Sequence, residues 1–433
     1  MNYLVRRFQQ YAYVLPLLVL GIGAMGRGVT NSLLFLYFLW GVIASVGALR
    51  NICDDLHDRK IMSIAIIWLA VYTSFLISNV YNDALDIGWK QLLVAFLSST
   101  TLLFTLWHAN QFHLLFNNKL LKWSLLFILA LYLYQLTGCM LDENCHPASS
   151  VSVMTLSVMY SFSVIFIYHH FHNNWLGWFI VFSVVISVLV FAANSRTEVL
   201  MVAFSTIIII SFYYKKIVLI LLMPLVFLCV LLAFSHFHHR GNLSVGNEKT
   251  EMQDTATLVR QPSFNQNRNT AAQENAGKNQ YQNAMANISS SRVRIFNLVK
   301  NNPPENVFLG AGVNNTQKFL PETHFHSALH DAYLEIWYET GYLGLILWFS
   351  LIVFLLGNIR RAYLFTENRH RLIYSAFLGG LMAVMTAGTF DKGYMSIYFT
   401  FFIYYLGAVL FLLGSEKAFD QFKSHKQESH VGG

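Results

Sequence analysis

Charged residues are scarce in this 433-residue sequence: they make up 12% of it, whereas hydrophobic residues make up 55%. A soluble globular domain ordinarily has about 25% charged residues. The composition therefore excludes an ordinary soluble protein and indicates a polytopic membrane protein. Almost no Asp or Glu lies in the middle of a long apolar stretch, and no Walker A pattern for ATP is present. Ion-coupled transporters usually need acidic residues along their pathway, so these absences weigh against a transporter.

Apolar stretches of about the length of a membrane helix recur along the chain. A helical span usually needs about 20 apolar residues. Twelve stretches approach this length, at about 11–25, 32–49, 61–80, 91–108, 121–140, 152–171, 174–192, 198–214, 216–236, 342–359, 372–390 and 395–414. We therefore predict an all-α polytopic membrane protein with about twelve transmembrane helices and a large loop between spans nine and ten.

The predicted spans divide the chain into four parts. Residues 1–236 hold spans one to nine, 237–341 form the loop, 342–414 hold spans ten to twelve, and 415–433 form a tail. Within the loop, residues 241–290 are rich in Asn, Gln, Ser, Thr and Ala and have almost no large apolar side chains. Such a segment buries too little surface to offset the entropy lost on ordering, so we expect it to be mobile.

Basic residues are distributed unevenly between the two sets of connections. With both termini cytoplasmic, sixteen Lys and Arg residues lie on the cytoplasmic side, and the short outward connections hold only Arg27, Lys90, Arg196 and Lys392. Because cytoplasmic connections retain positive charge, this bias predicts cytoplasmic termini and an outward, periplasmic loop. The net charge of +7 mostly reflects the same bias and gives no reason to expect nucleic-acid binding.

The four cysteines include one pair that is placed where a disulfide is chemically permitted. Cys139 and Cys145 flank a short outward connection, and an oxidising compartment would let them pair. Their spacing alone leaves open whether they do, because a bridge requires a specific geometry. Cys53 lies on the cytoplasmic side and Cys229 inside a predicted span, so we expect both to be free thiols.

Arg196 lies in a very short outward connection, between predicted spans seven and eight. An arginine costs about 2.5–3.5 kcal/mol at the centre of a span and less near the interface. A single arginine in an outward connection also runs against the charge bias, so we interpret Arg196 as functional. The alternative is an interfacial anchor or a partner for Glu198.

Two further arginines follow the polar segment of the loop. Arg292 and Arg294 alternate with apolar residues over 291–300, a pattern typical of a short amphipathic helix, which Pro303 would end. A guanidinium group can hold two phosphate oxygens at once, so the pair is a candidate anion site. Contact with anionic lipid headgroups is the alternative from the pattern alone.

A glycine-rich turn is predicted next, at residues 308–313. Gly310 and Gly312 permit a positive φ or a close approach of two backbones there. Residues 325–338 again have a helical pattern of apolar residues, and Gly341 precedes the tenth predicted span.

Three histidines, His324, His326 and His330, lie just before that span. A neutral imidazole, with its ordinary pKa of about 6.5, can accept the proton of an attacking hydroxyl group. Each histidine is alternatively a structural side chain. His326 and His330 have the i, i+4 spacing of helical metal ligands, but no HExxH pattern and no third ligand accompany them, so we predict no metal site.

These pieces, taken in order, resemble the O-antigen ligase and polymerase superfamily of bacterial envelope glycosyltransferases. Ser195-Arg196 after a span resembles the family's first arginine. Ser291-Arg292-Val-Arg-Ile-Phe296, followed by Pro303-Pro304 and Gly310-Ala-Gly312, resembles its Ser-Gly-Arg-x-x-x-aromatic…Pro…Gly-x-Gly motif. His330-Asp-Ala-Tyr-Leu334, ahead of Glu339-Thr-Gly341-Tyr-Leu-Gly344, resembles its His-Asn-x-Tyr-Leu…Gly-x-x-Gly motif. The similarity covers residues 190–350 strongly, and elsewhere only the plan of twelve spans.

The resemblance implies a glycosyltransferase of lipopolysaccharide biosynthesis in the bacterial inner membrane. It would transfer glycan from undecaprenyl pyrophosphate to a sugar hydroxyl of the lipid A core, on the periplasmic face. We expect Arg196 and Arg292 to hold the pyrophosphate and stabilise its charge as it leaves, with His330 as the general base of an inverting displacement. Arg294, His324 and His326 are further substrate-binding candidates. The partners expected are the lipid-linked donor, the lipid A core and membrane lipids, with no cofactor and no nucleic acid.

Two residues depart from the family's pattern. Asp331 stands where the family usually has Asn after the histidine, which would bear on how His330 is oriented. Ser291 stands where a glycine usually precedes the arginine, and we expect no effect from that change. The nearest alternative function is an O-antigen polymerase, which extends glycan on the lipid carrier. A flippase or secondary transporter would move its substrate without covalent change and would leave the outward Arg and His residues unexplained.

Overall fold

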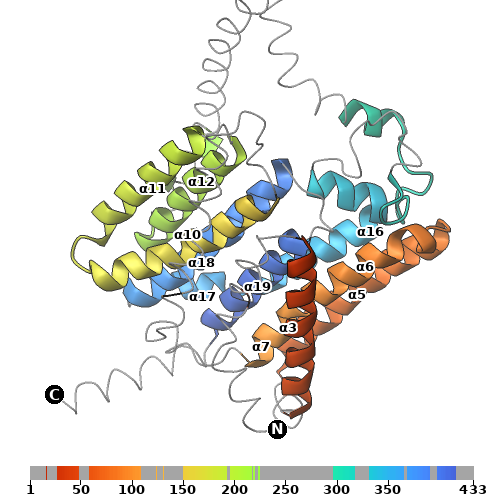
Figure 1. Cartoon of the computed structure of the whole chain (residues 1–433), viewed down its shortest axis with the longest axis horizontal. Helices are drawn as coiled ribbons and strands as arrows, with labels where there is room; N and C mark the ends of the chain where they lie inside the picture. The colour runs from red at the N-terminus through yellow and green to blue at the C-terminus, as the bar shows by residue number, and fades with distance from the viewer. Residues whose placement is uncertain are drawn as a thin grey trace, which may run out of the picture. The chain divides into compact units, whose positions relative to one another are not determined.

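A computed structural model of the chain describes, apart from a few isolated positions, residues 27–47, 58–108, 150–192, 196–216, 296–316, 331–364, 368–390 and 397–415. Within these ranges every regular element is a helix. The chain forms two compact units, one of Met1–Met223 with Pro303–Gly433 and the other of Pro224–Asn302. All helices labelled in Figure 1 belong to the first unit.

The described helices follow the predicted apolar stretches closely. They are α3 (Arg27–Gly47), α5 (Arg59–Tyr81), α6 (Leu85–Ser99), α7 (Thr101–His108), α10 (Ser150–His170), α11 (Trp175–Ala192), α12 (Arg196–Tyr213), α16 (Ala332–Leu355), α17 (Ile359–Tyr363), α18 (Asn368–Phe390) and α19 (Ile397–Leu413). The predicted fourth span is divided into α6 and α7 at Thr100. The spans predicted at 11–25, 121–140 and 216–236 lie wholly or mostly outside the described residues.

Four helical stretches in the described residues are long and apolar enough to cross a membrane: Arg59–Tyr81, Leu85–His108, Ala332–Tyr363 and Asn368–Thr389. The apolar helices Ser32–Gly47, Trp175–Phe191, Thr197–Tyr213 and Phe399–Leu413 are shorter. This part of the chain is therefore consistent with a helical membrane protein. The number of twelve spans, the position of the large loop and the mobility of residues 241–290, which lie outside the described residues, stay predictions.

Helix α18 packs most extensively against α12 and next against α10, and it also contacts α19. The backbones of α12 and α18 come close at Gly379, whose carbonyl accepts a hydrogen bond of 2.9 Å from the Ser205 hydroxyl. A Cβ atom at Gly379 would lie 2.7 Å from Cγ1 of Ile209, so a larger residue would force the helices apart. In Figure 1, α10, α11, α12 and α18 form one group, and α19 connects it to the group of α5, α6 and α16.

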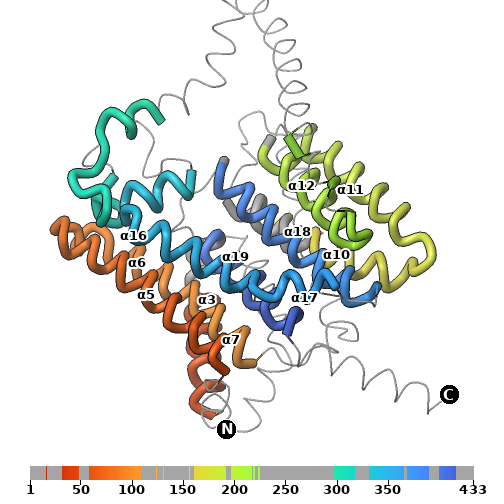
Figure 2. Tube along the Cα trace, turned by 180° about the vertical axis from the view of Figure 1, so that it is seen from behind, coloured from red at the N-terminus to blue at the C-terminus, as the bar shows by residue number. Residues whose placement is uncertain are grey.

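Helix α16 lies alongside α5, as Figure 2 shows from behind. The structure begins α16 at Ala332, ten residues before the predicted start of the tenth span at 342. The helix is interrupted at Gly341, where φ is 67° and ψ is −169°. A positive φ of this kind is readily adopted only by glycine. The predicted start of the span therefore coincides with a kink inside a longer helix.

The kink turns two backbone N–H groups of α16 away from their helical partners. In a continuous helix the N–H groups of residues 342 and 343 would bond to the carbonyls four residues earlier. Instead Tyr342 N donates to the Val307 carbonyl at 3.0 Å, and Leu343 N donates to the Phe308 carbonyl at 3.1 Å. We call residues 306–316, which provide these partners, the clamp segment.

The clamp segment also satisfies the carbonyl groups that the kink releases. Ala311 N donates to the Tyr338 carbonyl at 2.9 Å, and Gly312 N donates to the Glu339 carbonyl at 2.9 Å. The Ser78 hydroxyl of α5 donates a further bond of 2.7 Å to the Glu339 carbonyl. Unpaired backbone groups inside an apolar bundle cost several kcal/mol each, and these bonds avoid that cost at the kink.

Side chains at the end of α5 hold the clamp segment from the other side. Asn79 Oδ1 accepts a hydrogen bond of 2.5 Å from Val313 N. Asn82 Nδ2 donates to the Gly310 carbonyl at 3.1 Å and to the Ser78 carbonyl at 2.7 Å. The predicted glycine-rich turn is confirmed, because Gly310 has φ 78° and a Cβ atom there would collide with the backbone of Glu339.

Replacing Gly341 with alanine is expected to destabilise the protein by about 2 kcal/mol or more. The new Cβ would require a strained positive φ and would collide with the Phe308 carbonyl. Thermal unfolding in detergent measures the effect. Gly177→Ala in α11 is the matched control, because a Cβ at Gly177 meets nothing within 4 Å. Equal stability of the two variants would contradict this role for the kink.

Candidate functional site

Of the residues predicted to carry chemistry, the structure places Arg196, which is the first residue of α12. The other candidates, Arg292, Arg294, His324, His326 and His330, lie outside the described residues, as do the cysteines Cys139 and Cys145. Their roles stay predictions. The described ranges 296–316 and 331–364 nonetheless flank the three histidines in the sequence.

Asp331, the residue after His330, caps the N-terminus of α16. Its Oδ1 atom accepts hydrogen bonds from Tyr333 N at 2.9 Å and from Leu334 N at 3.0 Å. A carboxylate there also interacts favourably with the partial positive charge of the helix N-terminus. An asparagine oxygen can accept the same two bonds, so the departure of Asp331 from the resembled motif preserves the cap.

The first turn of α16 is joined to α18. The Tyr333 hydroxyl donates a hydrogen bond of 2.8 Å to the Met385 carbonyl, near the C-terminal end of α18. Tyr333 also stacks on Phe349, with the ring centroids 5.8 Å apart. The position at which the chain enters α16 is therefore fixed against a second helix.

The N-terminus of α12 lies at the same end of the first unit. Helices α12 and α18 are antiparallel, because Phe212 stacks on Tyr374 while Ser205 bonds to Gly379. At 1.5 Å per residue, Arg196 lies about 14 Å before Ser205 along α12. This brings it to the level of the C-terminal end of α18, where Tyr333 is bonded. The structure thus brings Arg196 and the residue that follows His330 to one end of the helical bundle.

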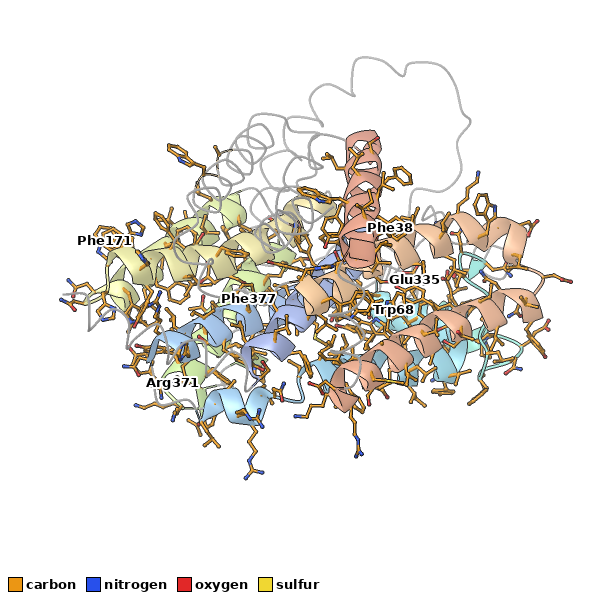
Figure 3. All side chains as sticks on the ribbon, turned by 90° about the horizontal axis from the view of Figure 1, so that it is seen from below. Phe38, Trp68, Phe171, Glu335, Arg371 and Phe377 are labelled. Atoms are coloured by element: carbon orange, nitrogen blue, oxygen red, sulfur yellow. The ribbon has the colours of Figure 1, made fainter. Side chains whose placement is uncertain are left out.

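Three buried carboxyl groups lie at this end, and none of them was among the predicted catalytic or substrate-binding residues. Glu198, in the first turn of α12, has no exposed surface. Glu335 and Glu339, one turn apart in α16, are 5% and 2% exposed, and Figure 3 labels Glu335. Glu339 Oε1 accepts a hydrogen bond of 2.8 Å from the Thr316 hydroxyl, which ties the end of the clamp segment to α16. The sequence feature that could have identified two of them is the i, i+4 spacing of Glu335 and Glu339 in a chain with few acidic residues.

Within the described part of the chain, no three His, Cys, Asp or Glu side chains are grouped as metal ligands would be. The three candidate histidines lie outside that part, so a site without metal stays a prediction.

Residues 181–349 match the model of a protein family described as O-antigen ligase. This part of the chain is similar to O-antigen ligases. It contains all six candidate residues, the clamp segment and the kink at Gly341. The predicted resemblance is confirmed over this region. No curated protein matches the chain significantly.

Asp331→Ala is expected to lower the free energy of unfolding by about 1 kcal/mol, because the two N–H groups at the start of α16 lose their acceptor. Asp331→Asn should unfold within a few tenths of a kcal/mol of the unmodified protein, since the amide oxygen replaces the carboxylate oxygen. Thermal unfolding of both variants measures this difference. A large loss of stability in the asparagine variant would show that the charge matters more than the cap.

Proposed function

We propose that this protein is an O-antigen ligase, an integral membrane glycosyltransferase that moves glycan from undecaprenyl pyrophosphate to a sugar hydroxyl of the lipid A core. The match of residues 181–349 to the O-antigen ligase family is the observation that carries the proposal. The N-termini of α12 and α16 lie at the same end of the helical bundle, which supports the proposal. Arg196 begins α12, and His330 comes shortly before α16 in the sequence.

In the proposed reaction the acceptor hydroxyl oxygen attacks the anomeric carbon of the glycan. The bond from that carbon to the pyrophosphate oxygen breaks, and the configuration at the carbon inverts. The hydroxyl proton passes to the imidazole of His330, and undecaprenyl pyrophosphate leaves with an additional negative charge. Arg196 and Arg292 would hold this charge, so the reaction requires no metal. Arg294, His324 and His326 would contact the substrates.

The described geometry suits Arg196 to this role. Because Arg196 is the first residue of α12, its backbone is part of a helix terminus whose first N–H groups have no partner within the helix. A helix N-terminus attracts phosphate through these N–H groups and its partial positive charge. The site would face the periplasm, as the distribution of basic residues predicts.

The family match fits an O-antigen polymerase as well as a ligase. The two enzymes would share the donor and the leaving group and would differ in the acceptor. The product therefore distinguishes them: a ligase places glycan on the lipid A core, and a polymerase leaves longer glycan on the carrier.

In a reconstituted assay, purified protein in lipid should move glycan from undecaprenyl pyrophosphate to the lipid A core. His330→Ala should slow transfer by about 10²–10⁴-fold, because the general base is lost. Gel separation of the products and thermal unfolding of the variant measure the two effects. Longer glycan that remains on the carrier would identify a polymerase instead, and absence of transfer in every condition would favour a transporter. Full activity of the variant would remove His330 from the mechanism.

Arg292→Lys keeps the positive charge but loses the planar fork that can hold two phosphate oxygens. We expect transfer to fall about tenfold or more at normal protein abundance, since bidentate bonds to the leaving group are lost. Arg294→Lys is the matched control and should have a smaller effect. If only the Arg294 variant loses activity, the pyrophosphate contact belongs to Arg294.

A further inference from the structure

Helix α12 ends in a conformation that is unusual for the residue that adopts it. Lys215 has a φ of 57°, in the left-handed region. Its N–H bonds to the Phe212 carbonyl at 3.3 Å, and Lys216 N bonds to the Ser211 carbonyl at 2.8 Å. This is the Schellman pattern of a helix C-terminus, whose left-handed position usually holds glycine. A lysine there is strained, so glycine at this position would relieve the backbone.

Helix α17 and the start of α18 lie beside this terminus. The Tyr363 hydroxyl of α17 donates a hydrogen bond of 2.9 Å to the Lys215 carbonyl, and its ring meets Phe212 edge-on with the centroids 5.4 Å apart. The guanidinium group of Arg371 lies 5.8 Å from the centroid of the Tyr213 ring.

These contacts bring basic residues of three elements together. We call them the basic face: Lys215, Lys216, Arg360, Arg361 and Arg371. The side chains of Lys215, Lys216 and Arg360 are exposed, and those of Arg361 and Arg371 are half-buried. None of the described residues of α17, the last two turns of α12 or the first two turns of α18 is acidic. One acidic residue, Glu367, follows in the connection outside the described residues.

Exposed apolar side chains border the basic face. Leu364, directly after α17, is 62% exposed, and Tyr214, directly before Lys215, is 43% exposed. Basic side chains next to exposed apolar and aromatic ones are typical of the boundary between bilayer and water. Figure 3 shows Arg371 and Glu335 on opposite sides of the view, so Arg371 of the basic face lies away from the first turn of α16.

We propose that the basic face binds the phosphate groups of anionic membrane lipids. Positive charge from three elements converges there, and the neighbouring apolar side chains fit the acyl region beneath a headgroup. A lipid held by Lys215 and Arg360 would connect α12 to α17, two elements that the Tyr363 bond already joins. This inference does not depend on the proposed glycosyl transfer.

Thermal unfolding in nanodiscs tests the proposal, with either phosphatidylglycerol or phosphatidylcholine as the lipid. The unmodified protein should unfold about 2 °C or more higher in the anionic lipid, because a ligand of the folded state raises its stability. Lys215→Gly, alone and together with Lys216→Gln and Arg360→Gln, should reduce this difference. Because Lys215→Gly relieves backbone strain, its midpoint in phosphatidylcholine should not fall. If the variant loses the difference between the two lipids while its midpoint in phosphatidylcholine is kept, the loss does not result from misfolding.

The matched control is Arg59→Gln with Lys60→Gln at the start of α5, where Asp58 lies beside the basic pair. This control should keep the full difference between the two lipids. Equal midpoints of the unmodified protein in both lipids would overturn the proposal. An equal loss of the lipid difference in the control variant would also overturn it. The same holds if inorganic phosphate, added to phosphatidylcholine discs, raises the unfolding midpoint as much as the anionic lipid does, since the surface would then bind free phosphate.

Discussion

The interruption of α16 at Gly341 is the constraint on which the arrangement of α5, α16 and the clamp segment depends. A helix broken inside an apolar bundle releases N–H and carbonyl groups that have no water to bond. The clamp segment satisfies these groups with four backbone hydrogen bonds, from residues 307 to 312. The kink and the clamp segment therefore require each other, because either one alone would leave backbone N–H or carbonyl groups unpaired.

This arrangement links α16 to α5 and to α18. Ser78 of α5 bonds to the Glu339 carbonyl, and Asn82, the C-cap of α5, bonds to the Gly310 carbonyl. Tyr333 bonds to the Met385 carbonyl of α18. The first turns of α16 are thus held between the two groups of helices. Asp331, which directly follows the predicted base His330 in the sequence, is held at the start of α16 by its two hydrogen bonds to that helix.

The sequence predicted the features that have local signals. Apolar runs predicted most of the described helices, and the glycines at 310 and 312 predicted the turn. The anchors on α5 were not predictable, because Ser78 and its partner Glu339 are 261 residues apart. Glu335 and Glu339 were missed because residues up to 341 were assigned to an outward loop, whereas the structure buries them in α16. The arginine and histidine assignments rest on the sequence, and the structure adds the placement of Arg196 and of the cap after His330.

Val307 and Phe308 of the clamp segment are joined to α16 through main-chain atoms, and this has a consequence for how the protein can change. Val307 and Phe308 use their carbonyl groups to hold the kink, while their side chains are 44% and 54% exposed. The side chains can therefore be exchanged without altering the bonds that hold the helix. Substitutions at these two positions would therefore change the outer surface of the clamp segment over an unchanged framework.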